Sequence, residues 1–293
     1  MKFDKVELIL FEEYLKKTDL SDSTRQRYIR FVQMFFNFPK YSDEEEQFRE
    51  FIIKHAQKKR GRMAYYAIRK YIQYKYSIIR AEKIIKRLPK IKNKTPRNKT
   101  IYLNRKDREN IINCIHDERC KLIARLQERL GARTSDVLRL RTNDFRFIPT
   151  LNGVVLEVTL TTKGDKTIIR PIYDTLLVKS MEHWLLNHEP FENYVFIRQR
   201  KKKEDNFLFN EYKYYRKILK EAIEDAGFEK NKFSTHDFRR CFVQDIYEQE
   251  GKDPYSAQLA AGHSDVSTTM RYLRSKNINA NKILENRYLK EGV

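Results

Sequence analysis

The N-terminal part of the chain repeats apolar positions at the spacing of α-helices. Residues 5–17 and residues 24–38 each place apolar side chains three and four positions apart, which predicts a helical hairpin. Ser42, followed three residues later by Glu45, has the spacing of a capping box and is expected to begin a third helix. The chain therefore begins with successive amphipathic helices.

A fourth helix and a linker are predicted next. Residues 63–79 alternate tyrosines with arginines and lysines, so one helix face can pack while the basic face either meets phosphates or is simply solvated. Residues 89–101 contain prolines and many basic residues but no apolar period, which is typical of an extended linker. We therefore predict an all-α domain over residues 1–88 and a second domain over residues 102–293.

The second domain opens with further helices. The patterns of residues 105–117 and 118–131 are helical, and Gly131 is expected to end the second of these helices. Another helix is predicted from Thr134 onward, with serine and aspartate in its first turn. Arg133 is therefore expected at the N-terminal end of a helix.

The apolar period then changes to that of strands. Residues 154–160 and 167–173 are rich in β-branched side chains, and the glycine-aspartate pair between them suits a tight hairpin turn. Lys163 and Lys166 are expected at the tip of this hairpin. The rest is predicted to be mostly helical, with a short strand over residues 194–197, so the fold class is mostly α with a small β-sheet.

The charge balance indicates a polyanionic partner. The 61 lysines and arginines outnumber the 40 aspartates and glutamates, which leaves a net charge of +21. Because 40% of the residues are hydrophobic, this is the composition of a folded protein and not of a disordered tail. Nucleic acid is favoured over a membrane surface, since the basic residues are spread along the whole chain.

The sequence also bears on the compartment. No apolar run approaches the ~20 residues that span a bilayer, and charges interrupt the apolar run near the N-terminus, unlike in a signal peptide. Cys114, Cys120 and Cys241 are too few and too scattered to staple a secreted scaffold of this size. We therefore expect a cytoplasmic protein without disulfides, associated with the nucleoid when it is bound to DNA.

The sequence lacks the short motifs that hold nucleotides or metals. It contains no GxxxxGK[ST] loop, no closely spaced acidic trio and no HExxH helix. Cys114, His116 and Cys120 lie in a helical pattern without a second ligand pair, so no zinc site is predicted. Asp245 and Glu248 are expected on a helix surface. We therefore predict no cofactor, no metal and no small-molecule substrate.

Two C-terminal segments carry candidate chemistry. Residues 235–251 are predicted to form a helix that presents His236 and Arg239 on one face, where the two side chains can hold one phosphate. His263 stands in a turn context, and Tyr272 follows a short helix that begins near Val266. Tyr272 is a candidate nucleophile.

Five segments of this sequence resemble the tyrosine recombinases, also called phage integrases, which include the Xer-type enzymes. They are ARTSDVLRL, TKGDKTIIRPI, HDFRR, AGHS and TTMRYLR, in the order and spacing of the family. The resemblance implies a helical DNA-clamping domain, a mixed α+β catalytic domain and six active-site residues: Arg133, Lys163, His236, Arg239, His263 and Tyr272. Asp136 stands where the family usually has glutamate, and Phe238 stands where it usually has leucine.

Physical chemistry is consistent with this set. Attack of a tyrosine oxygen on a phosphodiester gathers negative charge, which the guanidiniums of Arg133 and Arg239 can neutralise by bidentate hydrogen bonds. A tyrosine has a pKa of about 10, so a proton acceptor such as His236 is needed. His263 is expected to hydrogen-bond the phosphate.

The departing 5′-oxygen also needs a proton. A lysine at the hairpin tip can deliver it, and Lys163 matches the family position better than Lys166. The phosphotyrosine bond keeps the energy of the broken phosphodiester, so a second 5′-hydroxyl can rejoin the strands without ATP.

The resemblance therefore implies a site-specific recombinase of double-stranded DNA that acts as a homo-tetramer on two sites. Integration or excision of a mobile element and resolution of chromosome dimers both remain open as its role. A catalytically silent DNA-binding accessory protein and a type IB topoisomerase are the alternatives. The apolar stripe of Ile283, Leu284, Tyr288 and Leu289 is expected to pack on its own domain or on the next protomer.

Overall fold

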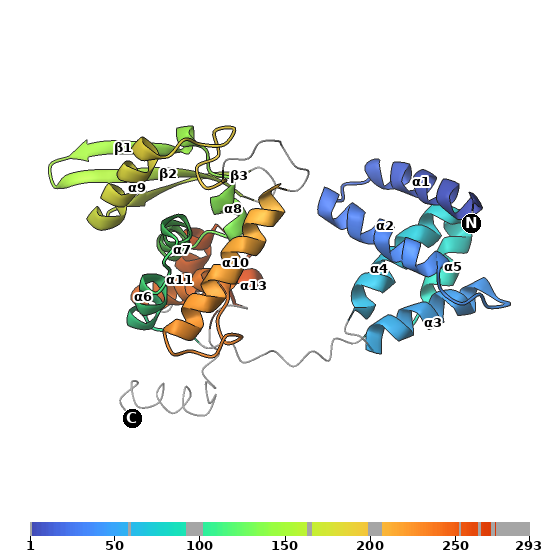
Figure 1. Cartoon of the computed structure of the whole chain (residues 1–293). Helices are drawn as coiled ribbons and strands as arrows, with labels where there is room; N and C mark the ends of the chain where they lie inside the picture. The colour runs from blue at the N-terminus through green and yellow to red at the C-terminus, as the bar shows by residue number, and fades with distance from the viewer. Residues whose placement is uncertain are drawn as a thin grey trace, which may run out of the picture. The chain divides into compact units, whose positions relative to one another are not determined.

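The computed structural model forms two compact units, Met1–Arg97 and Asn98–Val293 (Figure 1). The structure describes residues 2–57, 60–91, 102–162, 166–198, 207–251, 253–262, 265–270 and 273. Within these ranges no helix is long and apolar enough to cross a membrane.

The first unit is built from helices packed around an aromatic core. Its helices are α1 (Lys2–Lys16), α2 (Asp22–Phe36), α3 (Glu44–Gln57), α4 (Gly61–Lys75) and α5 (Ile78–Arg87). The ring of Tyr71, which is buried, lies 5.5 Å from that of Phe11 and 6.0 Å from that of Phe35 between centroids. Such aromatic contacts add to the free energy of apolar burial and tie α1, α2 and α4 together.

The prediction of one helix over residues 63–79 was wrong. Tyr76 and Ser77 have extended backbone conformations, with ψ angles of 159° and 154°, so α4 ends at Lys75 and α5 begins at Ile78. Serine side chains compete with helical hydrogen bonds, which makes Ser77 a natural break between two helices. The spacing of the apolar residues therefore does not show that the chain changes direction between α4 and α5.

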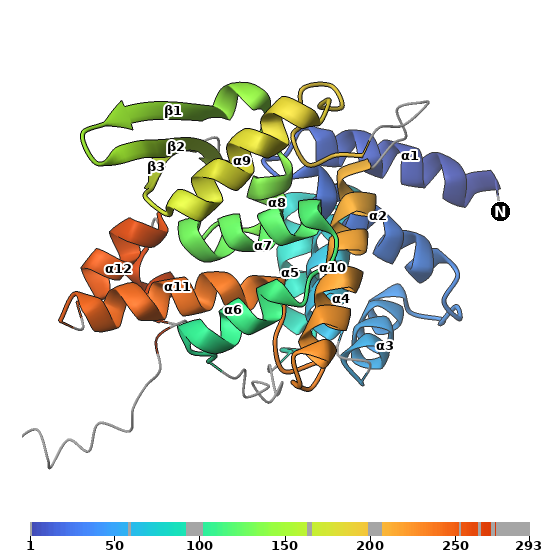
Figure 2. The same cartoon turned by 60° about the vertical axis from the view of Figure 1, so that its left-hand side comes forward.

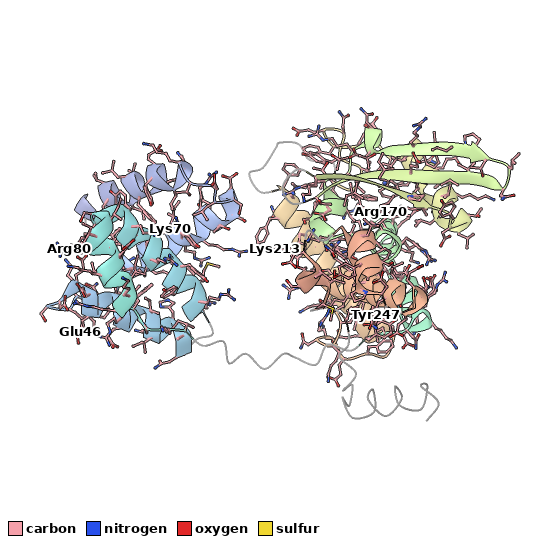
Figure 3. All side chains as sticks on the ribbon, turned by 180° about the vertical axis from the view of Figure 1, so that it is seen from behind. Glu46, Lys70, Arg80, Arg170, Lys213 and Tyr247 are labelled. Atoms are coloured by element: carbon pink, nitrogen blue, oxygen red, sulfur yellow. The ribbon has the colours of Figure 1, made fainter. Side chains whose placement is uncertain are left out.

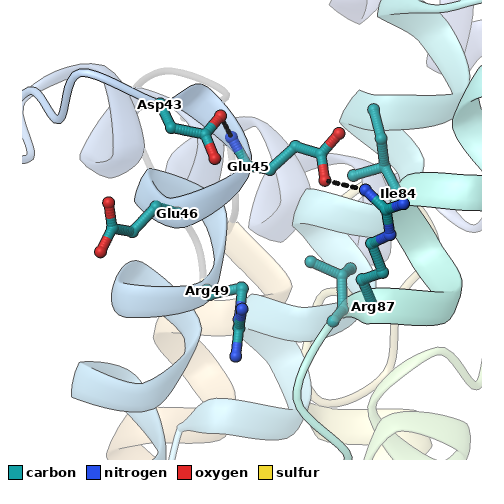
Figure 4. A pocket seen from close by; sticks show the side chains of 7 residues that line it. Asp43, Glu45, Glu46, Arg49, Ile84 and Arg87 are labelled. Atoms are coloured by element: carbon teal, nitrogen blue, oxygen red, sulfur yellow. Dashed lines mark hydrogen bonds and ion pairs between the residues drawn. The ribbon is translucent and has the colours of Figure 1, made fainter.

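The start of α3 also differs from the prediction. The helix begins at Glu44, and the carboxylate of Asp43 accepts the backbone N–H of Glu45 at 3.0 Å, so Asp43 takes the capping place predicted for Ser42. Glu45 instead pairs with Arg87 of α5 at 3.2 Å (Figure 4). The acidic first turn of α3 therefore joins two helices of the first unit.

The second unit places a small antiparallel sheet over a group of helices. Its elements, in chain order, are α6 (Arg105–Asn113), α7 (Glu118–Leu130), α8 (Thr134–Leu138), the 3₁₀ helix η1 (Thr142–Asp144), β1 (Phe145–Thr150), β2 (Gly153–Thr162), β3 (Lys166–Ile172), α9 (Thr175–Asn187), α10 (Phe207–Asp225), α11 (Thr235–Gln249), α12 (Pro254–Ala261) and α13 (Val266–Met270). The strand order is β1-β2-β3, and Figure 2 shows α7 and α11 on one side of the sheet. Helix α11 packs against both α7 and α12.

Two strand predictions need correction. Strand β1 was not predicted, although its pairing with β2 is regular from Phe145 opposite Val158 to Thr150 opposite Gly153. Residues 194–197 do not form the predicted strand, because Glu192 and Asn193 turn the backbone into positive φ and Tyr194 makes only isolated bridges. The predicted β2–β3 hairpin is present, with Leu160 opposite Ile168.

A buried ion network fastens α11 to the helices beside it. Arg108 of α6 is 2% exposed and lies 3.3 Å from Glu128 of α7 and 2.5 Å from Asp245 of α11. Breaking such a buried pair leaves an uncompensated charge, which is strongly destabilising. The sequence analysis placed Asp245 on a helix surface. The structure instead pairs its carboxylate with the buried guanidinium of Arg108.

Candidate active site

A tight turn places Arg133 at the start of α8. Helix α7 ends at Gly131, whose φ of +60° is the left-handed conformation predicted for a helix stop. A Cβ atom on Gly131 would lie 2.3 Å from Cδ1 of Phe242, so the α11 ring occupies the space that any other residue would need. Glycine is therefore required here by both backbone conformation and packing.

Arg133 is held by the helix that follows it. It is the N-cap residue of α8, and its backbone N–H donates to the carboxylate of Asp136 at 3.4 Å. The same carboxylate, which is buried, lies 3.5 Å from Nη1 of Arg133. The side chain of Arg133 remains 34% exposed, so a ligand can reach a guanidinium whose position is already fixed.

Arg239 connects the two segments that flank the candidate site. The residue is 3% exposed, and its Nη1 donates to the backbone oxygen of Gly131 at 2.6 Å. Its Nη2 donates to the backbone oxygen of Ala261 at 2.7 Å. One guanidinium therefore joins the turn before Arg133 to Ala261, which is both the last residue of α12 and the first residue of the AGHS segment.

His236 lies one helical turn before Arg239 on α11, close to Arg133. Part of the residue is exposed, yet the protein atoms around its imidazole partly desolvate the ring and lower its pKa below the ordinary 6.5. The positive charges of Arg239 and Arg133 act in the same direction, and Asp237 opposes them. The imidazole is therefore favoured in the neutral form, which can accept a proton.

Gln127 is a site residue that the sequence did not reveal. This fully buried amide on α7 donates to the Thr134 hydroxyl and to the Thr235 backbone oxygen, both at 3.1 Å. Its own oxygen accepts the hydroxyl of Tyr215 at 2.8 Å. Since Thr134 follows Arg133 and Thr235 precedes His236, Gln127 holds together the two helix starts that carry them. A single glutamine in a helix that also carries several charged residues gives no signal of this role in the sequence.

Three of the six predicted residues, Lys163, His263 and Tyr272, lie outside the described residues. The described residues beside them are placed as follows. Gly262, with φ of +65°, directly follows the Ala261 oxygen that Arg239 binds. Leu273 packs against the small apolar cluster that Val243 of α11 forms with Ala257 and Ala261 of α12. Arg133, His236 and Arg239 are thus gathered around the first half of α11.

The thiols of this unit are buried structural groups. Cys120 and Cys241 are both buried, and burial raises the pKa of each thiol. In the described part of the chain, no three His, Cys, Asp or Glu side chains are grouped so that they could hold a metal ion.

The sequence matches the Phage integrase family over residues 101–278, more than half of the chain. The chain belongs to the phage integrase family. This membership confirms the prediction of a tyrosine-type site-specific DNA recombinase. No curated protein matches the sequence.

Solved structures of phage integrases and Xer recombinases share its fold. A lambda integrase dimer bound to a COC′ core site has 13% identity and a TM-score of 0.65, covering 92% of this chain and 76% of that chain. A XerH recombinase bound to a palindromic difH substrate has 18% identity and a TM-score of 0.61, covering 91% and 80%. The Tn1549 transposon integrase with transposon right end DNA has 13% identity and a TM-score of 0.61, covering 96% and 98%. The predicted fold class, mostly α with a small β-sheet, is confirmed.

Both departures from the family pattern have a structural account in this integrase. Asp136 reaches the backbone and the guanidinium of Arg133 with its shorter side chain. Phe238 is fully buried and contacts the ring of Phe233 edge to face, with centroids 5.0 Å apart. Both substitutions therefore leave the surroundings of Arg133 and Arg239 intact.

Proposed function

We propose that this chain cuts and rejoins double-stranded DNA at specific sites through a 3′-phosphotyrosine formed by Tyr272. Arg133, Lys163, His236, Arg239 and His263 would complete the active site. The observation that carries the proposal is the pair of hydrogen bonds from Arg239 to the oxygens of Gly131 and Ala261. A guanidinium that joins two motif segments supports a single site assembled from distant parts of the chain.

The proposed reaction exchanges one phosphodiester for another. The Tyr272 oxygen bonds to phosphorus as the bond from phosphorus to the 5′-oxygen breaks, and His236 takes the tyrosine proton. Arg133 and Arg239 stabilise the charge on the phosphoryl oxygens, with His263 as a further hydrogen-bond donor. Lys163 gives a proton to the leaving 5′-oxygen. A 5′-hydroxyl from a second duplex then reverses the step, so neither ATP nor a metal is required.

The first unit, within the predicted domain of residues 1–88, would supply further DNA contacts. Arg27 and Arg30 are exposed on α2, and Arg62 and Arg69 are exposed on α4, which packs against α2. No acidic side chain pairs with any of these four among the ion pairs of the described residues. Lys70, labelled in Figure 3, lies on the same helix. Unpaired, solvated cations are suited to backbone phosphates.

We propose that the working assembly is a homo-tetramer on two DNA sites, in the cytoplasm and on the nucleoid. The similar structures include a lambda integrase dimer on a core site and a lambda integrase tetramer bound to a Holliday junction. Strand exchange requires two duplexes and cuts on all four strands, so four active sites are needed for one complete reaction. Integration or excision and dimer resolution fit this chemistry equally.

The test is a recombination assay that compares one site with two. Duplex fragments tiled from the genomic neighbourhood of the gene are incubated with wild-type protein, first singly and then in pairs that differ in length. We expect recombinant lengths only when two sites are present. Relaxation of a supercoiled plasmid with a single site and no exchange would support a type IB topoisomerase instead. Specific binding without any cleavage would support the accessory-protein alternative.

The lowered pKa of His236 predicts the pH dependence of cleavage. Because its pKa lies below 6.5, more than half of the imidazole is neutral and able to accept the tyrosine proton at that pH. We expect the midpoint of the acidic decline in the single-turnover rate to lie below pH 6.5. Rates measured from about pH 5 to about pH 8 test this. His236→Gln should be slow and should lack the acidic decline; a decline centred above 6.5 would contradict the assignment.

A further inference from the structure

Arg170 breaks the apolar pattern of the inner face of the sheet. Side chains alternate between the two faces of a strand, so Arg170 shares its face of β3 with Ile168 and Ile172. On β2 it stands opposite Val158, which is fully buried. A cation therefore occupies a row that is otherwise apolar. A charged residue at a position where the strand pattern calls for an apolar one is expected chiefly at a functional site.

The surroundings of Arg170 leave its charge uncompensated. Its guanidinium lies 5.8 Å from the centre of the Phe242 ring, and its Nε is buried without a hydrogen-bond partner. No carboxylate pairs with it in the described part of the chain. Burial alone lowers its pKa. Arg170 is thus a partly desolvated cation that has a ring contact and no counter-ion among the described residues, an arrangement that opposes folding.

Arg170 also lies beside the candidate active site. Phe242 is on α11 one turn after Arg239, and its ring also fills the space beside Gly131. A Cβ atom on Gly262, the residue before His263, would be 3.9 Å from Nη2 of Arg170. The labelled position of Arg170 in Figure 3 is on the side of the sheet that faces these helices. Along α11, Phe242 is about 9 Å from His236 at 1.5 Å of rise per residue.

We infer that Arg170 binds a backbone phosphate of the DNA substrate, beside the phosphate that Arg133 and Arg239 would hold. Phosphates follow one another every 3.4 Å or so of duplex axis on each strand, so a second phosphate falls within this range of the first. The DNA would provide the anion that the described residues do not. This inference rests on the proposed function, because it takes DNA as the substrate. Arg170 is a binding residue and takes no part in bond making.

An inward-facing charge on an edge strand has another known use. Strand β3 is at an edge of the sheet among the described strands, and a charge pointing inward from such a strand hinders edge-to-edge association. That explanation needs no ligand and predicts that loss of the charge leads to self-association with DNA binding unchanged.

The test compares two arginine-to-methionine variants in the full chain. Methionine keeps an unbranched apolar stem and removes the charge. For Arg170→Met we expect the melting temperature to stay level or rise, because an unpaired buried charge is lost.

The affinity of Arg170→Met for a duplex of fixed length should fall about tenfold. The slope of log K against log salt concentration should decrease by about 0.9. Arg146→Met, on the exposed face of β1 at the opposite edge, is the matched control and should change each quantity less.

Arg170→Lys adds a rescue arm, because it restores the charge and should recover part of both the affinity and the slope. Equal losses in Arg170→Met and Arg146→Met would overturn the inference, as would self-association of Arg170→Met with unchanged DNA affinity. Failure of the wild-type protein to bind duplex DNA would instead refute the proposed function itself. The two failures are therefore distinguishable in one set of titrations.

Discussion

We expect Tyr272→Phe to form no covalent DNA adduct under conditions that trap the wild-type protein. The substrate is a duplex nicked next to the cleavage site, so that the short strand with the 5′-hydroxyl diffuses away and cannot reverse the reaction. Phenylalanine keeps the ring and removes only the oxygen that would bond to phosphorus. The loss should therefore be at least about 10⁴-fold in rate, the scale on which an enzyme loses activity with its nucleophile. SDS-resistant species on a denaturing gel measure it.

The control must remove the hydroxyl of a nearby tyrosine that takes no part in the cleavage reaction. Tyr255 is 69% exposed on α12, the helix against which Leu273 packs, so Tyr255→Phe is the matched variant and should form adduct at the wild-type rate. Equal DNA binding by both variants would show that the contrast lies in chemistry. Adduct formation by Tyr272→Phe would disprove the nucleophile assignment and direct the search to other tyrosines.

Much of this fold is predictable because its signals are local. Asn104 and Asp117 each accept a backbone N–H at the start of a helix, at 2.8 Å in both cases, and Gly131 ends α7 in the left-handed conformation. Each of these interactions joins residues three positions apart or depends on one backbone angle. The helix starts that carry Arg133 and His236 follow from the same kind of signal.

The features that escaped the sequence depend on distant partners. The pattern of residues 63–79 does not reveal that the chain turns at Ser77, because apolar residues continue on both sides of the corner. Gln127 contacts Thr235, which is 108 positions away, and no period within α7 marks that contact. The charge of Arg170 is visible in the sequence, but its place on the inner face becomes clear only once β2 and β3 are paired. Tertiary context decides such features.

Arg239 shows how the chemistry and the architecture of the site depend on one side chain. Its hydrogen bonds to the oxygens of Gly131 and Ala261 span positions 108 and 22 residues away, and both of those residues are buried. A guanidinium carries five donors in a fixed plane, so two of its nitrogens can donate to both oxygens at once. The ammonium of a lysine cannot reproduce that fork. Replacement of Arg239 by lysine, which keeps the charge and removes the fork, therefore tests the role of the fork.

We expect Arg239→Lys to lower the single-turnover cleavage rate by at least about 10²-fold, the usual cost of removing one donor that stabilises a transition-state charge. The free energy of unfolding should fall by about 1–3 kcal/mol, because at least one buried backbone oxygen loses its partner. Affinity for duplex DNA should change only a few-fold, since the charge is kept and most contacts lie elsewhere. Adduct formation at saturating protein and thermal denaturation measure the two effects separately.

Arg240→Lys is the matched control for this variant. Arg240 is the next residue on α11, is half-buried, and pairs with Asp237 at 3.1 Å without contact to Gly131 or Ala261 among its described partners. Its replacement should change the cleavage rate and the stability only slightly, because lysine can keep the ion pair. If Arg239→Lys lost stability and kept full cleavage, Arg239 would be a structural brace alone, and Arg133 would be the guanidinium that stabilises the phosphoryl charge.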